Sequence, residues 1–502
     1  MKTTFQLGLV LLTQMLFAAE PAWTTAHQQK PMTVAETKAF MKTLAQYVFD
    51  HHLKQDAKSA QRGMIYEYYD VKSKQWVQGE GLDTMHDGAW FAVAMVNAYR
   101  ATGDTFYKDF LAKWQLPFYL KMLNHSDELF TSERNDGRPS DDRGWRGSKE
   151  WLLQGREKGF VPYWWDDGAS ISLEMQARKD KDEHVNFAAR NDWGDRPNPE
   201  KRLSGYSHGS SNHMAQDLAV MLQQTWLLLR DPAIAEAAKN LHECRMRHHG
   251  HIPAVCAALA VATGDAEELK RVPEPNDPGF FKPNNAYYHA THDFKPGQRY
   301  PIPGFADDQQ YRYYFGLASS GGKLPEPLAF KTIYDACTEP LLYRAYSDDA
   351  PVPPGIGRFD LHPYYFRDGK PEDLRSQRKG PGGKPRPIGS RFGPQNMICC
   401  GWALQALREY PDLLEKHPQP ELRDAKASLE RELGGGLRTW EAIFKEYGYI
   451  PTGIGAGGAG GVYQWENFSD TGGYAHLISA ATQWIFYLEG RRDWEQHRVP
   501  QR

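Results

Sequence analysis

The chain has 502 residues, a formal net charge of −3 and 25% charged residues. Its 60 basic and 63 acidic residues interleave, which leaves no basic surface of the kind that nucleic-acid-binding proteins carry. Its five cysteines are too few and too irregularly spaced for a disulfide scaffold or a zinc ribbon, although one disulfide is possible. Adjacent Cys399 and Cys400 are expected to pack as small apolar side chains.

The first residues are typical of a secretory signal. Lys2 supplies the charge, residues 7–17 the apolar run, and Ala18-Ala19 or residues 24–26 the small-residue cleavage region. We therefore predict a signal peptide over residues 1–26 and an exported protein, periplasmic or secreted. No later segment approaches about 18 uninterrupted apolar residues, so no membrane span is expected.

The rest of the chain shows helical periodicity. Residues 34–49 have apolar side chains at helical spacing, whereas residues 88–99 are apolar on nearly every side, as in a buried helix. Buried and amphipathic helices alternate, and similar connectors recur at residues 101–104 and 262–265. We predict an all-α fold, an (α/α)6 or (α/α)7 toroid that forms a single catalytic domain over residues 27–502 without a large β domain. Long loops rich in Pro, Gly and aromatic residues are expected to build a cleft; they cover residues 132–164, 177–205, 271–311 and 348–393.

A polar segment, residues 205–217, runs directly into the apolar helix of residues 218–229. Its Asn212-His213 pair resembles the pair found in helical-toroid polysaccharide lyases of the alginate and glucuronan lyase type. The resemblance implies that Asn212, His213 and an arginine neutralise a uronate carboxylate before β-elimination, with His208 assisting. The alternative is that Asn212 caps the helix and His213 fills a satisfied polar niche.

Elimination also needs a tyrosine that moves protons, and residues 287–314 offer several. Tyr300 beside Arg299 is our first candidate and Tyr313 beside Arg312 the second, because a guanidinium favours the phenolate. Each tyrosine taken singly is more often a core or rim residue than a catalytic one.

Two further polar segments, residues 84–90 and 163–168, contain acids and aromatic residues. Each is expected to lead into a buried helix, the second at residues 169–175, and to face the same cleft. The predicted substrate-binding residues from these two segments are His86, Asp87, Trp90, Trp164, Trp165 and Asp167, and Arg299 joins them. Trp164 and Trp165 suit stacking on sugar rings, whereas the plainer role for Asp87 and Asp167 is helix capping.

The same acids favour a second reading. Residues 86–103 look like the corresponding region of unsaturated glucuronyl hydrolases, and Asp87 with Asp167 would then supply the acid and base of an α/α-barrel glycoside hydrolase. The Arg-Gly-Gln-Ala-Trp type of motif associated with those hydrolases is absent. Elimination is therefore the main expectation, with hydrolysis and a non-catalytic carbohydrate-binding protein as alternatives.

Neither a metal nor an organic cofactor is expected, although a divalent cation bridging uronates remains open. The histidines at positions 248, 249 and 251 lack a matching distant ligand in the sequence pattern. The Gly-rich residues 453–461 lack the preceding strand and the Lys-Ser/Thr end of a phosphate-binding loop. The expected partner is an acidic polysaccharide substrate.

Overall fold

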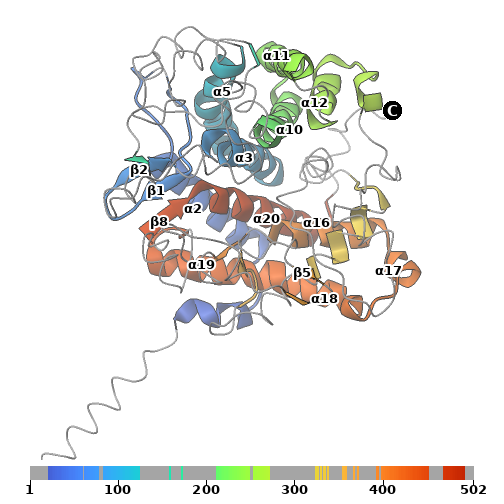
Figure 1. Cartoon of the computed structure of the whole chain (residues 1–502). Helices are drawn as coiled ribbons and strands as arrows, with labels where there is room; N and C mark the ends of the chain where they lie inside the picture. Colours follow the sequence, from blue (N-terminus) through green and yellow to red (C-terminus); the bar gives the residue numbers. More distant parts are fainter. Residues whose placement is uncertain are drawn as a thin grey trace, which may run out of the picture.

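A computed structural model describes the chain in several stretches (Figure 1). The described residues are 21–59, 61–78, 83–124, 158–159, 171–172, 211–248, 253–271, 323–326, 328–330, 332–334, 336–337, 353–358, 366–367, 370–371, 392–394, 397–451 and 467–491. Within this part, no helix is long and apolar enough to cross a membrane.

Helices dominate the described part, which confirms the all-α class. The longer ones are α2 (Val34–His51), α3 (Ala89–Thr102), α10 (Ser211–Leu229), α11 (Pro232–His248), α12 (Pro253–Thr263), α16 (Met397–Glu409), α19 (Gly436–Tyr447) and α20 (Thr471–Glu489). The short α-helices are α4 (Thr105–Phe110), α5 (Leu116–Leu123), α17 (Leu413–Lys416) and α18 (Ala425–Glu430). The 3-10 turns are η1 (Ala22–Thr24), η2 (Ala26–Gln28), η10 (Glu268–Arg271) and η15 (Pro420–Leu422). The π-helical turns are η3 (Asp83–Gly88), η4 (Leu111–Gln115) and η16 (Arg431–Gly435).

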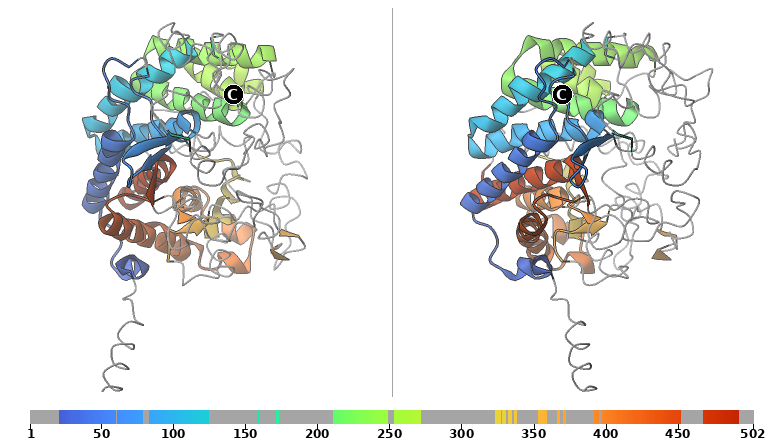
Figure 2. Two further views of the ribbon diagram at one scale, coloured as in Figure 1. Left: turned by 60° about the vertical axis from the view of Figure 1, so that its left-hand side comes forward. Right: turned by 90° about the vertical axis from the view of Figure 1, so that its left-hand side faces the viewer.

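Five helices form an inner row in which each packs against the next, in the order α12, α10, α3, α20 and α16. Their side chains are buried on nearly all sides, as predicted for α3 from its continuous apolar sequence. Amphipathic helices pack outside the row, with α11 against α12 and α10, α2 against α20, and α18 against α16. Along the chain the two kinds of helix largely alternate, and Figure 2 shows the arrangement from two further sides.

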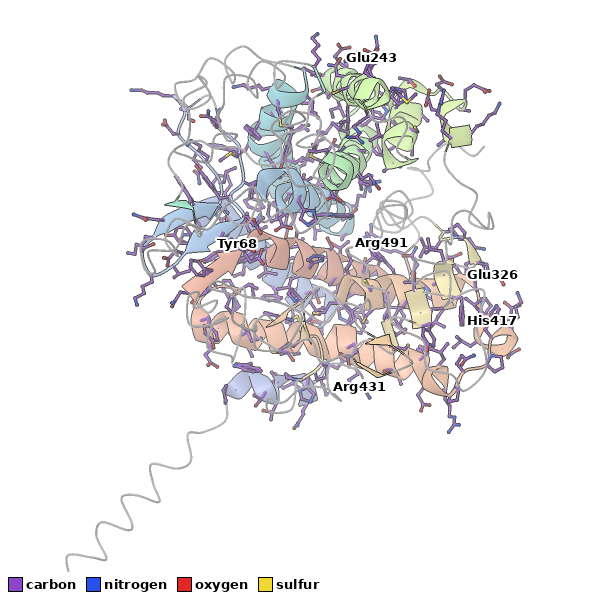
Figure 3. The ribbon with its side chains drawn as sticks, in the orientation of Figure 1. Tyr68, Glu243, Glu326, His417, Arg431 and Arg491 are labelled. Carbon is purple, nitrogen blue, oxygen red and sulfur yellow. The ribbon has the colours of Figure 1, made fainter. Side chains whose placement is uncertain are left out.

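The inner helices α3, α10 and α20 run parallel, because contacts join their C-terminal ends to one another and all three pack against η3 at their N-terminal ends. At their C-terminal ends Arg100 donates to Gln224 Oε1 at 2.9 Å. Arg491, labelled in Figure 3, donates to the carbonyl oxygens of Arg100 and Ala101. The N-terminal ends of the three helices therefore lie together at the opposite end of the molecule.

Glycine ends several helices where the sequence predicts a stop. Gly103 and Gly264 follow α3 and α12 with φ of +70° and +75°, the left-handed conformation that glycine adopts without strain. The break between α10 and α11 lies at residues 230–231, and Arg230 also has a positive φ. All five cysteines are buried and none forms a disulfide; Cys399 and Cys400 pack in the main core as expected.

A small sheet lies beside the start of α20, with strand order β3-β2-β1-β8. Its strands are β1 (Tyr68–Asp70), β2 (Gln75–Gln78), β3 (Ile171–Ser172) and β8 (Phe468–Asp470). Strands β4 (Gly357–Arg358) and β7 (Phe392–Gly393) form one two-stranded pair, and β5 (Phe366–Arg367) and β6 (Lys370–Pro371) form another. The helix expected over residues 169–175 is wrong at Ile171 and Ser172, because Ile171 pairs with Val77 in a parallel ladder.

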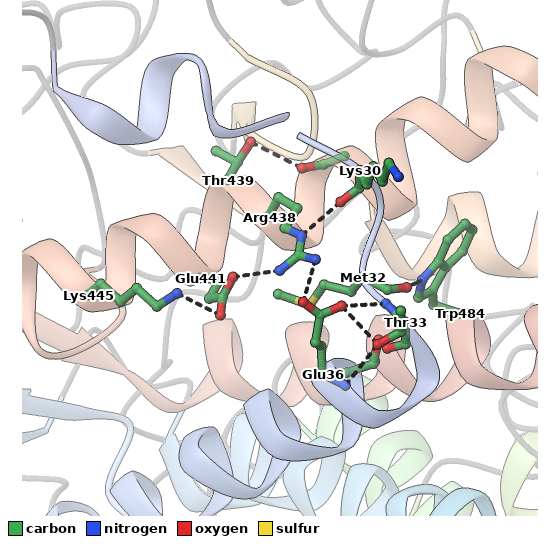
Figure 4. A network of polar contacts seen from close by, with 11 residues as sticks. Lys30, Met32, Thr33, Glu36, Arg438, Thr439, Glu441, Lys445 and Trp484 are labelled. Carbon is green, nitrogen blue, oxygen red and sulfur yellow. Dashed lines mark hydrogen bonds and ion pairs between the residues drawn. The ribbon is translucent and has the colours of Figure 1, made fainter. Parts of the chain in front are cut away.

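The start of the described chain is fastened to the C-terminal half (Figure 4). The Arg438 guanidinium donates to the Lys30 carbonyl oxygen and to Glu36 Oε1, at 2.9 and 2.7 Å. Glu36 and Thr33 form a reciprocal capping box at the start of α2. One of the two predicted cleavage regions, residues 24–26, overlaps η1 and η2, which pack against α19. The other, Ala18-Ala19, lies outside the described part, as do all of residues 1–20.

Candidate active site at the inner-helix starts

Side chains from η3 and from two of the inner helices, α3 and α10, meet at the N-terminal ends of these helices. His86 Nδ1 lies 2.5 Å from Asp217 Oδ2, although the two residues are 131 positions apart in the sequence. Trp90 donates its indole N–H to Asp217 Oδ1 at 3.0 Å. The end of η3, the first turn of α3 and the second turn of α10 are therefore joined through one carboxylate.

The Asp217 side chain is fully buried, with 0% of its surface exposed. A buried carboxylate is costly unless hydrogen bonds replace its lost hydration. Both of its oxygen atoms have such partners, His86 on one and Trp90 on the other. Asp217 is thus placed to hold and orient the imidazole rather than to touch a ligand itself.

The imidazole of His86 lies between two carboxylates. With Nδ1 directed at Asp217, the other ring nitrogen, Nε2, lies 3.4 Å from Asp87 Oδ1. The side chains of His86 and Asp87 are 15% and 14% exposed, in contrast to Asp217. These two groups, unlike Asp217, are therefore within reach of a ligand.

Asp87 also lies against the start of the third helix, α20. A Cβ atom added at Gly472 would lie 2.9 to 3.0 Å from the three carboxyl atoms of Asp87, closer than real side chains approach. The missing side chain of Gly472 thus makes room for the carboxylate. The N-terminal end of a helix favours a negative charge placed there.

The entry to α3 is a π-helical turn, η3, which holds the consecutive residues His86 and Asp87 directly before the helix. Such wide turns are rare and are found frequently at functional sites. Gln115 fixes the turn by donating its side-chain amide to the Gly88 carbonyl oxygen at 2.5 Å. Tyr119 packs against the same turn, because its hydroxyl occupies the space that a Cβ atom at Gly88 would need.

Three residues predicted from the sequence, His86, Asp87 and Trp90, are thus brought together. Asn212 and His213 belong to the first turn of α10, as expected, but their side chains lie outside what the structure describes. The other predicted site residues also lie outside the described residues: Trp164, Trp165, Asp167, His208, Arg299, Tyr300, Arg312 and Tyr313.

Asp217 is the site residue that the sequence analysis missed as a functional side chain. Asp217 is the last residue of the polar segment 205–217, in which Asn212 and His213 were the predicted site residues. A signal was present, since an acid followed by the apolar residues 218–222 of a buried helix requires a partner. Its partner could not be named without knowing which helix packs beside α10.

Comparison with known proteins gives a distant likeness. No protein-family model and no curated protein matches the chain. Among solved structures, an inactive variant of an α-1,6-mannanase of Salegentibacter sp. HEL1_6, in complex with α-1,6-mannotetrose, matches with 9% sequence identity and a TM-score of 0.35. The match covers 90% of this chain and 99% of the mannanase chain.

The main functional expectation is corrected. The matched protein is a mannanase, a glycan hydrolase, and the expectation of a lyase acting on glucuronan or alginate-like uronic acid polymers is wrong. The described site gives a physical reason, because its partly exposed acid, Asp87, and the buried Asp217 lie on the two sides of His86. A uronate carboxylate would be repelled there, whereas elimination requires that it be neutralised.

Proposed function

We propose that the chain is an exported glycoside hydrolase whose catalytic site lies at the converging starts of α3, α10 and α20. The observation that carries the proposal is the cluster of His86, Asp87, Trp90 and Asp217. The alternation of buried and amphipathic helices supports its assignment to an α/α toroid, (α/α)6 or (α/α)7. The signal-like residues 1–26 support export.

Glycoside hydrolysis needs two carboxyl groups that flank the scissile bond. One protonates the leaving oxygen, and the other activates water or attacks the sugar directly. Asp87 meets the requirement for one of them, because it is partly exposed and held by His86 on one side and by the start of α20 on the other. Asp217 does not, since it is fully buried.

We assign the second carboxyl group to Asp167, which the sequence analysis paired with Asp87. The chain reaches strand β3 four residues after Asp167, and β3 belongs to the sheet beside the start of α20. The position of β3 in this sheet supports the assignment.

The remaining polar and aromatic residues would bind the sugar. His86, oriented by Asp217, has Nε2 directed toward Asp87, where it can exchange a proton with the carboxyl group or donate to a sugar hydroxyl. Trp90 is partly buried and its indole is held in place by Asp217. Trp164 and Trp165 supply stacking surfaces, and Asn212 and His213 supply hydrogen bonds to hydroxyl groups.

The test follows new reducing ends, with near-ultraviolet absorbance recorded in parallel. The purified chain is incubated with an α-linked mannan, other neutral glycans, an acidic polymer and an unsaturated uronyl disaccharide. Hydrolysis releases reducing ends from a polymer without a rise in absorbance. With the disaccharide, hydrolysis lowers the absorbance. Folded protein that releases nothing from any of these glycans would contradict the proposal.

Variants locate the activity within the molecule. Asp87→Asn should lower kcat by about a hundredfold or more, because it removes a group that transfers a proton or forms a bond. Asp217→Asn should give a smaller loss by loosening His86. The matched control is Asp109→Asn, an exposed acid on α4 that pairs with Lys113. Equal rates for Asp87→Asn and Asp109→Asn would remove Asp87 from the mechanism.

A further inference from the structure

A second group of chemically reactive side chains lies away from the site of His86 and Asp87. It consists of His242 on α11, Cys256 on α12 and Glu268 on η10, three elements that pack together at the top of Figure 1. The ligating atoms of these three residues all lie within 4.8 Å of one another. Glu243, labelled in Figure 3, marks the position of this part of α11.

From this arrangement we propose that His242, Cys256 and Glu268 form a binding site for a zinc ion. Imidazole nitrogen, thiolate sulfur and carboxylate oxygen are the three ligand types that zinc takes in proteins. In tetrahedral coordination, ligand atoms about 2.1 Å from zinc lie about 3.4 Å apart. His242 Nε2 and Glu268 Oε2 are 3.1 Å apart, close to that spacing.

The surroundings of the three ligands suit a metal site. Cys256 is completely buried in a small apolar cluster with Leu227, Ala260 and Leu269. His242 and Glu268 have side chains that are 13% and 15% exposed, so an ion can enter from their side. Three protein ligands leave one coordination position for water.

Arg271 lies beside the carboxylate and completes the arrangement. Its Nε atom is 3.2 Å from Glu268 Oε2, the oxygen that also faces His242. With zinc bound, Arg271 remains as an outer partner that orients the carboxylate, a role that such groups commonly have in metal sites. The Cys256 thiol gives up its proton to solvent when the ion binds, so uptake is weaker at low pH.

Zinc would fasten η10 to α11 and α12. Because an ion that binds the folded chain shifts the folding equilibrium, the melting temperature should rise with zinc concentration. Binding does not depend on glycan hydrolysis, so this proposal and the proposed function stand or fall separately.

The test uses cobalt(II) as a spectroscopic probe on the full chain after treatment with a chelator. One equivalent of cobalt should produce a near-ultraviolet sulfur-to-cobalt charge-transfer band, and zinc should abolish it by displacement. Absence of the band overturns the proposal. A cobalt spectrum without sulfur character also overturns it, since that result would place the ion on other histidines such as His249 or His251.

Matched variants identify the ligands. Cys256→Ala should lose the sulfur band, and Glu268→Gln should bind zinc at least about a hundredfold more weakly, because changes outside the ligand set already cost about 10- to 100-fold. The controls are Cys244→Ala, which changes a buried cysteine on α11, and Glu267→Gln, which changes an exposed acid that pairs with Lys270. A sulfur band that survives in Cys256→Ala, or unchanged zinc affinity in Glu268→Gln, would overturn the assignment. Metal-free melting curves show whether each variant is folded.

Discussion

The imidazoles of His86 and His52 both lie where the inner helices start. Their neighbours differ, and so do the roles that the two side chains can have. His86 is partly exposed and faces a carboxylate from each ring nitrogen. His52 is completely buried, with Nδ1 near the Tyr66 carbonyl oxygen and Nε2 near the Ser469 hydroxyl. Neutral partners and burial favour a neutral ring, so His52 is a structural group and His86 a candidate functional one.

The environment of His52 predicts how stability depends on pH. Burial lowers the pKa of His52 from 6.5 to about 3. The unfolded chain therefore takes up a proton at higher pH than the folded chain does. Stability is unaffected above about pH 6.5 and falls as the pH drops toward 3, by about 3 kcal/mol at about pH 4.5.

The measurement compares urea unfolding of the wild type and His52→Gln at about pH 7 and about pH 4.5. The variant is less stable at neutral pH but should lose about 3 kcal/mol less on acidification. His417→Gln, which changes an exposed histidine, should behave as the wild type does. Equal acid sensitivity in His52→Gln and the wild type would show that His52 does not control this loss.

At the scale of residues, the sequence predicted part of the site. His86, Asp87 and Trp90 were recognisable because a short polar segment precedes a helix that is apolar on nearly every side. The role of Asp217 was not recognisable. It depends on α10 packing beside α3 with the Asp217 side chain facing His86. Periodicity reveals a buried face but not the helix that it contacts.

At the scale of elements, the start of α20 supports the site through a glycine. Gly472→Ala should push the Asp87 carboxylate away, because the new Cβ atom would lie within 3.0 Å of it. A displacement of about 1 Å at a catalytic group can lower the rate about a hundredfold. We expect kcat to fall by that order, while melting temperature changes little since alanine favours helix.

The neighbouring residue provides the control for this prediction. A Cβ atom at Gly473 would meet a methyl group of Ile450 at 3.3 Å and does not approach Asp87. Gly473→Ala should therefore keep its rate. Similar kinetics for the two alanine variants would mean that the start of α20 does not position the catalytic carboxylate.

Helix positions were predictable from local sequence, whereas η3 and β3 were not. Helices α2 and α3 lie where apolar spacing predicts them, and α10 includes the predicted helix of residues 218–229. The π-turn η3 depends on Gln115 and Tyr119, which come from the elements that follow α3. Strand β3 exists because Ile171 meets Val77, about 90 residues earlier, and no local pattern reports that pairing.

At the scale of the whole molecule, the parallel inner helices give the protein two different ends. At one end, polar contacts of Arg100 and Arg491 join the C-terminal ends of α3, α10 and α20. At the other end, the starts of the same helices meet around Asp87 and Asp217. The alternation of helices along the chain was predictable from the sequence, whereas the closure of the ring stays a prediction, because it depends on residues outside the described part.

The central claim is that the site around Asp87 catalyses the hydrolysis of a glycosidic bond. The most direct measurement is mass spectrometry of the products formed in water enriched in oxygen-18. Hydrolysis predicts one heavy oxygen at each new reducing end, with both product halves saturated, and Asp87→Asn should abolish this labelling. Products that carry a new double bond and no heavy oxygen would show elimination instead and would contradict the account.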